Sequence, residues 1–245
     1  MAGKKVCPVA HVSRMRYPLT LTEQQCSRFP LAEALGTGMN ATVFQHAEDP
    51  DKVIKITLDA EDAKAARLIK GARHGNLVEI FDVAQLGKKD ARGRQFYAII
   101  AEKLKPLSEM EQLTVRTVSD YVQDIDDRWS DLAEDLGESP DEPSDFGLIA
   151  EIAQDNCENL GAEGDIDESE VRDCQRYLPQ MAKAMRQMDG AGFRTVDLHG
   201  ANWGRRTPRG ELVLLDFGAS RLRKVVPEFD LAGRPRRRFS KRKGR

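Results

Sequence analysis

The sequence predicts an α+β protein in which a small β-rich half is followed by a helical half. Short apolar runs separated by turn residues occupy residues 31–102, which is typical of antiparallel strands. Apolar residues recur at intervals of three and four over residues 169–189, which is the periodicity of an amphipathic helix. With 245 residues, 40% of them hydrophobic, the chain is long enough for one or two domains with a buried core.

In the first half, two apolar runs at 41–44 and 52–56 flank a turn of acidic residues and proline, which indicates an antiparallel hairpin. Residues 59–72 are rich in helix-forming side chains, with acidic residues in the first turn and basic residues later, so a helix is predicted there. Two further strands are expected over residues 77–84 and 95–102.

In the second half, an acidic stretch is interrupted at residues 139–144, whose two prolines favour a loop. The amphipathic helix over residues 169–189 is followed by two glycines, which are expected to end it. An apolar strand is predicted over residues 212–217.

Composition excludes several classes of protein. No run of 18 or more apolar residues is present, so we expect neither a membrane-spanning helix nor a membrane partner. No apolar stretch follows the first lysines, so a secretory signal is not expected. Four distant cysteines without a Cys-x-x-Cys pair indicate neither a disulfide scaffold nor a zinc framework. We therefore expect a cytoplasmic protein with reduced cysteines: Cys7, Cys26, Cys157 and Cys174.

Charge is distributed unevenly, although the formal net charge is -2. Residues 109–173 hold 22 acidic and three basic side chains, and we expect a solvated acidic insert over about 118–168. Its carboxylates lack the spacing of a calcium loop. Residues 1–28 are expected to form an N-terminal extension or a lid. The basic tail, residues 223–245, is expected to contact nucleic acid or an acidic surface, including the acidic stretch of this chain.

Two elements in the first half point to phosphate chemistry. Gly36 and Gly38 stand between two strands, where backbone N–H groups can approach a phosphate without side-chain obstruction. Lys55 follows 17 residues after Gly38 among apolar neighbours and could place a cation on that phosphate. The structural alternatives are a simple turn and a surface lysine.

Two elements in the second half supply oxygen ligands. Asp197 and Asn202 form a loop that offers a carboxylate base and a neutral metal ligand. Asp216, at the end of an apolar strand and two residues before Gly218, is a natural Mg²⁺ ligand. A polar turn and a strand-terminating aspartate are the alternatives. Four elements in this order are hard to obtain by accident, so we favour the functional interpretation.

Together these residues resemble the signature set of the protein kinases, over about residues 31–222. The resemblance implies a bilobal protein kinase-like fold, with a β-rich N-lobe over residues 29–104 and a truncated helical C-lobe over residues 105–222. It implies ATP and Mg²⁺ as cofactors, with Asp197 accepting the proton of the substrate hydroxyl. Asn202 and Asp216 would bind the metal.

The resemblance also implies a nucleotide site, in which Lys55 pairs with the α- and β-phosphates and the glycines cover them. Residues 101–104 resemble the kinase hinge. The implied phosphate-binding residues are Gly36, Gly38 and Lys55, and the implied adenine-binding residues are Val43, Ala101, Glu102 and Leu104.

Two departures from the kinase pattern matter. The helix glutamate that pairs with the strand lysine is not at the expected place, where Ala65 stands; Glu61 is the first candidate and Asp62 the second. Thr195 and Val196 replace the family's His-Arg before the catalytic aspartate, so we expect activity without activation-loop phosphorylation.

Only 27 residues follow Gly218 and no Ala-Pro-Glu is present, so we expect a minimal kinase without the usual helical substrate platform. The short chain, the truncated second lobe and the basic tail resemble the early serine/threonine kinases of short-tailed lytic phages. This resemblance implies host cytoplasmic proteins as substrates, including the transcription machinery. Ser240, inside the basic tail, is a candidate autophosphorylation site.

Three alternatives stay open. The loop from Asp197 to Asn202 also resembles that of aminoglycoside and choline phosphotransferases. The basic C-terminal residues resemble those of small atypical kinases in tRNA modification. A pseudokinase that binds ATP without transferring phosphate is the non-enzymatic alternative, although its site would usually have lost one of the four elements.

Overall fold

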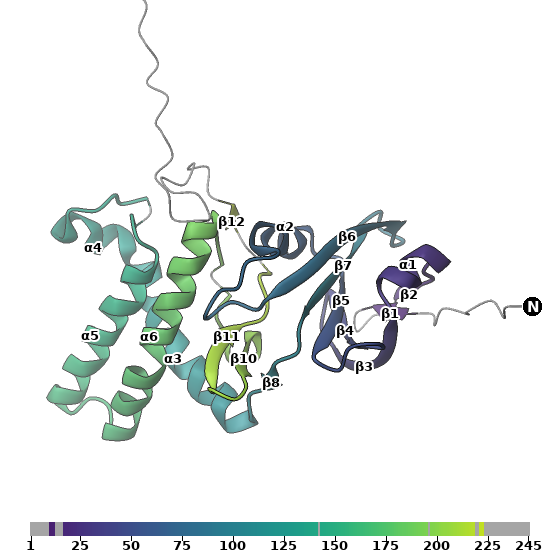
Figure 1. The fold of residues 1–245 in the computed structure, drawn as a ribbon. Coiled ribbons are helices and arrows are strands. Elements are labelled where there is room, and N and C mark those ends of the chain that lie inside the picture. The colour runs from purple at the N-terminus through teal and green to yellow at the C-terminus, as the bar shows by residue number, and fades with distance from the viewer. Residues whose placement is uncertain (1–9, 13–16, 142, 196, 219–220, 223–245) are drawn as a thin grey trace, which may run out of the picture.

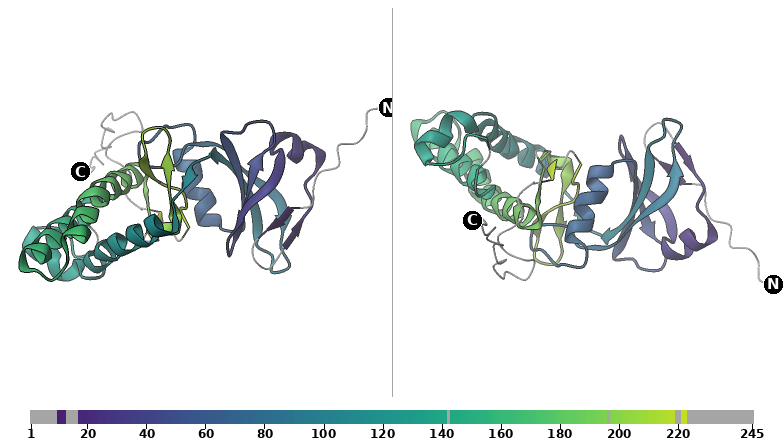
Figure 2. Two further views of the ribbon diagram at one scale, coloured as in Figure 1. Left: turned by 90° about the horizontal axis from the view of Figure 1, so that it is seen from below. Right: turned by 90° about the horizontal axis from the view of Figure 1, so that it is seen from above.

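The computed structural model describes residues 10–12, 17–141, 143–195, 197–218 and 221–222. Over these residues the chain has an α+β fold with a five-stranded antiparallel sheet and six α-helices (Figure 1). The sheet lies at one end of the molecule and the long helices lie at the other (Figure 2).

The strands are β1 (Ala10–Val12), β2 (Tyr17–Leu19), β3 (Leu31–Thr37), β4 (Ala41–His46), β5 (Lys52–Thr57), β6 (Ile80–Lys89), β7 (Gln95–Glu102), β8 (Lys105–Pro106), β9 (Phe193–Arg194), β10 (Trp203–Arg206), β11 (Glu211–Leu214) and β12 (Arg221–Leu222). The helices are α1 (Glu23–Arg28), α2 (Ala60–Ile69), α3 (Glu109–Asp127), α4 (Trp129–Leu136), α5 (Gly147–Glu163), α6 (Glu168–Ala191) and the short 3-10 helix η1 (Gly200–Asn202).

The large sheet has the strand order β3-β4-β5-β7-β6, and each neighbouring pair is antiparallel. Successive side chains of a strand point to opposite faces. On β5, therefore, the fully buried Ile54 and Ile56 face one side of the sheet, and Lys55 faces the other. Lys55 lies opposite Val43 of β4 and Ile99 of β7, so the middle of the sheet fixes its position.

One face of the sheet is covered by the segment that precedes it. Leu19, Leu21 and Phe29 are at most 5% exposed and pack with the apolar residues of β4, β5 and β7. Helix α1 begins with a reciprocal capping box between Thr22 and Gln25, which satisfies N–H groups at its first turn. Leu19 and Leu21, within the expected extension over residues 1–28, therefore belong to the core of the sheet.

The acidic stretch forms helices, not a solvated insert. Val115, Val118 and Val122 of α3 are at most 2% exposed, and Ile149 and Ala153 of α5 are fully buried. These side chains pack with α6 in one apolar cluster, while most of the acidic side chains lie on the outer faces. The expectation was wrong because the many charges obscured the helical apolar repeat. The loop expected at residues 139–144 lies between α4 and α5, as predicted.

The cysteine expectation is also corrected. A disulfide joins Cys157 of α5 to Cys174 of α6, with the two Cα atoms 6.7 Å apart. Helices α5 and α6 pack side by side, so residues 17 positions apart in sequence meet at the buried face of each helix. No free cysteine occurs among the residues that the structure describes.

The small sheet of β11, β10 and β8 lies between the large sheet and the long helices (Figure 1). Backbone hydrogen bonds from Val78 to Leu214 and from Leu214 to Asn76 attach it to the loop before β6. Within the described ranges, no helix is long and apolar enough to cross a membrane. The basic tail, residues 223–245, lies outside the described residues.

Candidate functional site

Lys55 lies between two carboxylates. Its Nζ atom is 2.8 Å from Oδ2 of Asp62 on α2 and 2.9 Å from Oδ1 of Asp216, which follows β11. The side chain of Lys55 is 14% exposed and that of Asp62 is 2% exposed. Three segments that are far apart in sequence therefore meet at one ammonium group.

Burial and charge act in opposite directions at this triad. Burial alone would lower the pKa of Lys55, but the two carboxylates outweigh it and raise that pKa. Burial raises the pKa of Asp62 to about 6, and the like charge of Asp216 adds to this. Burial also opposes ionisation of Asp216, yet Lys55 and the backbone N–H of Gly218 hold the pKa of that carboxyl below its ordinary value. Lys55 is thus a fixed cation.

Helix α2 explains why Asp62, and not Glu61, reaches the lysine. The carboxylate of Asp59 caps the helix by accepting the N–H groups of residues 61 and 62, which fixes where the first turn begins. Asp62 then shares the buried face of the helix with Ala65 and Ile69, following the helical repeat. Glu61 points away and pairs with Lys64 at 2.6 Å. Glu61, the first candidate, is therefore not the partner of Lys55. Asp62, the second candidate, is.

A cavity of about 580 Å³ opens beside Lys55. Its lining includes eight residues that the sequence pointed to: Gly36, Val43, Lys55, Asp62, Ala101, Glu102, Leu104 and Asp216. Aliphatic side chains that the sequence analysis did not single out complete the walls: Val53, Val78, Ile80, Ile99 and Leu215. The strand alternation of β5 and β7 could have indicated Val53 and Ile99, because they share the face of Lys55. The lining of the cavity is therefore mostly apolar, and its charged side chains include the Lys55 triad, Glu102 and Lys103.

The two glycines of the β3–β4 hairpin are not required by the fold. Gly36 pairs with Val43 in the strand ladder, and the N–H of Gly38 donates to the carbonyl of Ala41 at 2.8 Å. A Cβ atom at Gly36 would meet nothing within 4 Å, and one at Gly38 would approach only that carbonyl, at 3.8 Å. Neither residue has a positive φ. Gly36 lines the Lys55 cavity, whereas Gly38 does not.

The loop from Asp197 to Asn202 is fastened to the segment after β11, which carries Asp216. The side chain of Asn202, 6% exposed, donates from Nδ2 to the carbonyl of Asp197 at 2.9 Å, and its own carbonyl accepts the N–H of Leu215 at 2.7 Å. Thr195 accepts the N–H of Asp197 and donates to the carbonyl of Gly218 at 2.9 Å. The relative placement of the two aspartates is thus fixed by hydrogen bonds.

Helix α3 supports this loop from the other side. A Cβ atom at Gly200 would come 2.0 Å from the carbonyl oxygen of Gln112, so only glycine allows the loop to lie against the helix. The buried hydroxyl of Ser119 donates to the carbonyl of Leu198 at 2.7 Å, and the indole of Trp203 donates to the same carbonyl at 2.8 Å. Sequence analysis did not identify α3 as the support of this loop.

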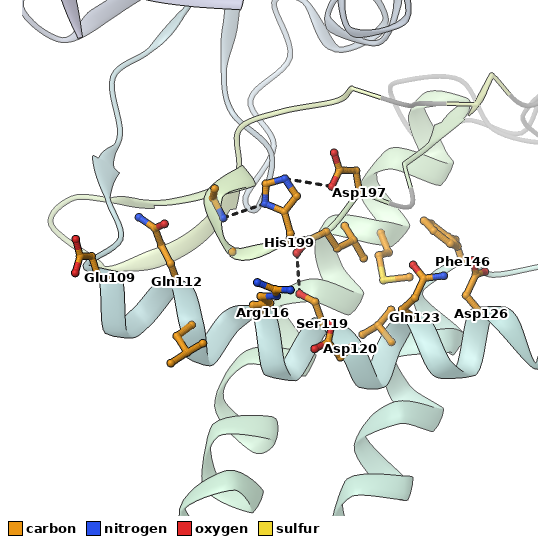
Figure 3. A pocket seen from close by; sticks show the side chains of 16 residues that line it. Glu109, Gln112, Arg116, Ser119, Asp120, Gln123, Asp126, Phe146, Asp197 and His199 are labelled. Carbon is orange, nitrogen blue, oxygen red and sulfur yellow. Dashed lines mark hydrogen bonds and ion pairs between the residues drawn. The ribbon is translucent and has the colours of Figure 1, made fainter. Parts of the chain in front are cut away.

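Asp197 lines a second, larger cavity of about 640 Å³, between the loop and α3 (Figure 3). Its side chain is 40% exposed, and Oδ1 lies 3.4 Å from Nε2 of His199. The other ring nitrogen of His199 accepts the N–H of Ala201 at 3.2 Å, so the proton of a neutral ring is on the nitrogen that faces Asp197. His199 therefore lies beside the carboxylate with a nitrogen facing it.

Two of the expected groups suit a hard cation. Asp216 supplies a carboxylate, and because Nδ2 of Asn202 donates within the loop, its Oδ1 atom is the one available to a metal. Neither Asn202 nor Asp197 lines the Lys55 cavity. Among the described residues, no three or more His, Cys, Asp and Glu side chains gather as a candidate metal cluster.

A scan of the chain against protein-family models gives no match, and a search of the curated proteins gives none either. The chemistry of the site is therefore inferred from its own residues. Two cavities adjoin at Ala201, which lines both. One is mostly apolar and is lined by the Lys55 triad, and the other is lined by Asp197.

Proposed function

We propose that the protein is an ATP- and Mg²⁺-dependent phosphotransferase, and specifically a serine/threonine protein kinase. The observation that carries the proposal is the meeting of Lys55, Asp62 and Asp216 in the wall of a mostly apolar cavity. A fixed cation beside an apolar slot suits a ligand with a flat apolar base and an anionic chain. A nucleoside triphosphate has this form.

In this proposal the adenine lies between the aliphatic walls, with Val43 and Ala101 on one part of the lining and Leu215 on another. Lys55 binds the phosphates, and Asp62 holds the lysine in place. The absence of side chains at Gly36 and Gly38, which the fold itself does not require, leaves the backbone free to approach the phosphates.

Asp216 and Asn202 would hold Mg²⁺, which supplies neutralisation of the phosphate charge when bound. Asp197 accepts the proton of the acceptor hydroxyl, and Nε2 of His199 lies 3.4 Å from its carboxylate. No covalent intermediate is needed, because phosphoryl transfer depends mainly on positioning and on charge neutralisation.

We also propose that the fold is bilobal and kinase-like, with an N-lobe over residues 29–104 and a C-lobe over residues 105–222. The sheet of β3 to β7 with α2 would form the first lobe, and the helices α3 to α6 the core of the second. We further propose cytoplasmic proteins of a bacterial host, including the transcription machinery, as substrates, which follows from the resemblance to phage kinases.

The experiment is transfer of phosphate from γ-labelled ATP, with Mg²⁺, to the proteins of a bacterial lysate. The wild-type protein should label discrete bands, and Asp216→Asn should lower that labelling at least about 100-fold. Asp131→Asn is the matched control, because it changes one exposed carboxylate on α4 to an amide and leaves both cavities intact. Labelling should be retained there.

A small-molecule phosphotransferase is the second candidate, favoured by the size of the cavity beside Asp197, since about 640 Å³ suits a drug-sized ligand. An aminoglycoside added to the same assay tests it. Transfer to the aminoglycoside with no labelled protein would replace the protein-kinase proposal. Binding of ATP with no transfer to any acceptor would identify a pseudokinase.

A further inference from the structure

The cavity beside Asp197 lies outside the proposed nucleotide site. One wall is a face of α3 and the opposite wall is the loop that carries Asp197 and His199 (Figure 3). The α3 side chains on that face recur at intervals of three and four, so one stripe of the helix lines the whole cavity. Since Ala201 also lines the Lys55 cavity, a group bound here lies next to both the proposed base and the proposed nucleotide.

Carboxylates outnumber the basic side chains in the lining of this cavity. Glu109, Asp120 and Asp126 of α3 join Asp197, and Arg116 is the single Lys or Arg among the lining residues. A cleft lined mainly by one sign of charge attracts ligands of the opposite sign. The cavity therefore favours a cationic acceptor over a neutral or anionic one.

The basic tail matches this requirement in composition. Eight of the twelve residues 234–245 are Arg or Lys and none is acidic. Ser240 is the one hydroxyl-bearing side chain in residues 221–245. The tail and Ser240 lie outside the described residues.

The chain enters the tail close to the loop. Strand β12 (Arg221–Leu222) pairs with β9 (Phe193–Arg194), and β9 ends three residues before Asp197. Three residues span at most about 11 Å, whereas the eighteen residues from Leu222 to Ser240 can span up to about 60 Å. Ser240 can therefore reach the carboxylate of Asp197 in the same molecule.

We infer that the cavity between α3 and the loop is the acceptor site for a basic segment, and that the tail of this chain occupies it with Ser240 as acceptor. This inference rests on the proposed function. The Oγ atom of Ser240 forms a bond to the γ-phosphorus while the bond from that phosphorus to the β–γ bridging oxygen breaks. ADP leaves with the bonding electrons, and the hydroxyl proton passes to the carboxylate of Asp197. The α3 carboxylates bind the flanking arginine and lysine side chains.

The test uses the full chain with γ-labelled ATP and Mg²⁺, and mass spectrometry to locate the phosphate. Ser240 should take up phosphate at a rate that does not change when the protein is diluted, because the acceptor is in the same molecule. Glu109→Gln and Asp120→Asn should each slow the uptake by about fivefold at low ionic strength, and added salt should reduce the difference. Asp131→Asn, outside the cavity, should not change the rate.

A second measurement separates charge recognition from folding. A synthetic peptide of residues 234–245 should accept phosphate at least about tenfold faster than the same peptide with its arginines and lysines replaced by glutamine. Equal rates for the two peptides, or uptake at Ser240 that is unaffected by both α3 variants, would overturn the inference. Label on lysate proteins with none on Ser240 or on the peptide would overturn it and leave the proposed function standing. No transfer to any acceptor would overturn both.

Discussion

Glu102 at the end of β7 and Arg206 of β10 form an ion pair that is almost fully removed from solvent. The guanidinium also donates to the carbonyls of His74 and Leu77, and the carboxylate accepts the N–H of Glu79 at 2.8 Å. One residue pair thus joins the large sheet, the loop before β6 and the small sheet, next to the cavity that Glu102 lines.

Removing one side chain of the Glu102–Arg206 ion pair should lower the stability of the protein. Arg206→Met leaves a buried carboxylate without its cation, and we expect the free energy of unfolding to fall by about 3 kcal/mol. Arg209→Met is the control, because that side chain is 82% exposed and should change the stability by less than about 0.5 kcal/mol. Urea denaturation of both variants measures the difference. Equal stability of the two would show that the pair does not hold these segments together.

Asp62 and Glu61 are adjacent acidic residues, but their substitution should have different effects on phosphate transfer. Asp62→Asn should lower kcat/KM for ATP-dependent transfer by about 100-fold, because Lys55 loses the buried partner that positions it. Glu61→Gln removes only the contact with Lys64 and should leave kcat/KM within about twofold. A larger effect at Glu61 than at Asp62 would contradict the assignment of the lysine partner.

Two glycines provide another matched pair. Gly200→Ala forces a methyl group into the backbone of Gln112, so we expect a loss of about 3 kcal/mol in stability together with a displaced loop and lower transfer activity. Gly190→Ala, in α6, meets open space and should stabilise the protein by about 0.5 to 1 kcal/mol, since alanine favours a helix. Thermal unfolding of each variant distinguishes the two positions. Similar shifts would indicate that the loop can move away from α3.

Glu111 makes part of the stability dependent on pH. Hydrogen bonds from the backbone and side chain of Ser108, together with Arg205, lower the pKa of Glu111 to about 2. The folded value lies below the unfolded value, so the stabilisation is present above about pH 4.5 and is lost as the pH falls toward 2. Because the side chain is 34% exposed, we expect Glu111→Gln to cost only about 1 kcal/mol at pH 7.

Denaturation of Glu111→Gln and of the wild-type protein at pH 7 and at pH 3 measures this effect, with the difference shrinking at the lower pH. Glu134→Gln, an exposed position on α4, should change the stability by less than about 0.5 kcal/mol at either pH. A difference for Glu111→Gln that is as large at pH 3 as at pH 7 would mean that the helix cap, and not the ionised carboxylate, is responsible.

The sequence by itself determined the elements that depend on local patterns. The apolar run around Lys55 predicts a strand, and the helix formers after Asp59 predict α2. Gly36, Lys55 and Asp216, which line one cavity, are identified from their residue types and their order in the chain. Side-chain periodicity and turn chemistry act over a few residues, so they are visible without the fold.

Tertiary structure alone decided which acidic residue pairs with Lys55, because Glu61 and Asp62 differ by one position and only the packing of α2 selects the inner one. It also decided that the acidic stretch is a helical core, since its apolar repeat becomes decisive only when α3, α5 and α6 bury it together. The tertiary structure likewise decided the pairing of Cys157 with Cys174 and the contact of Gly200 with α3. Each is a contact between segments whose separation in sequence carries no information about their distance in space.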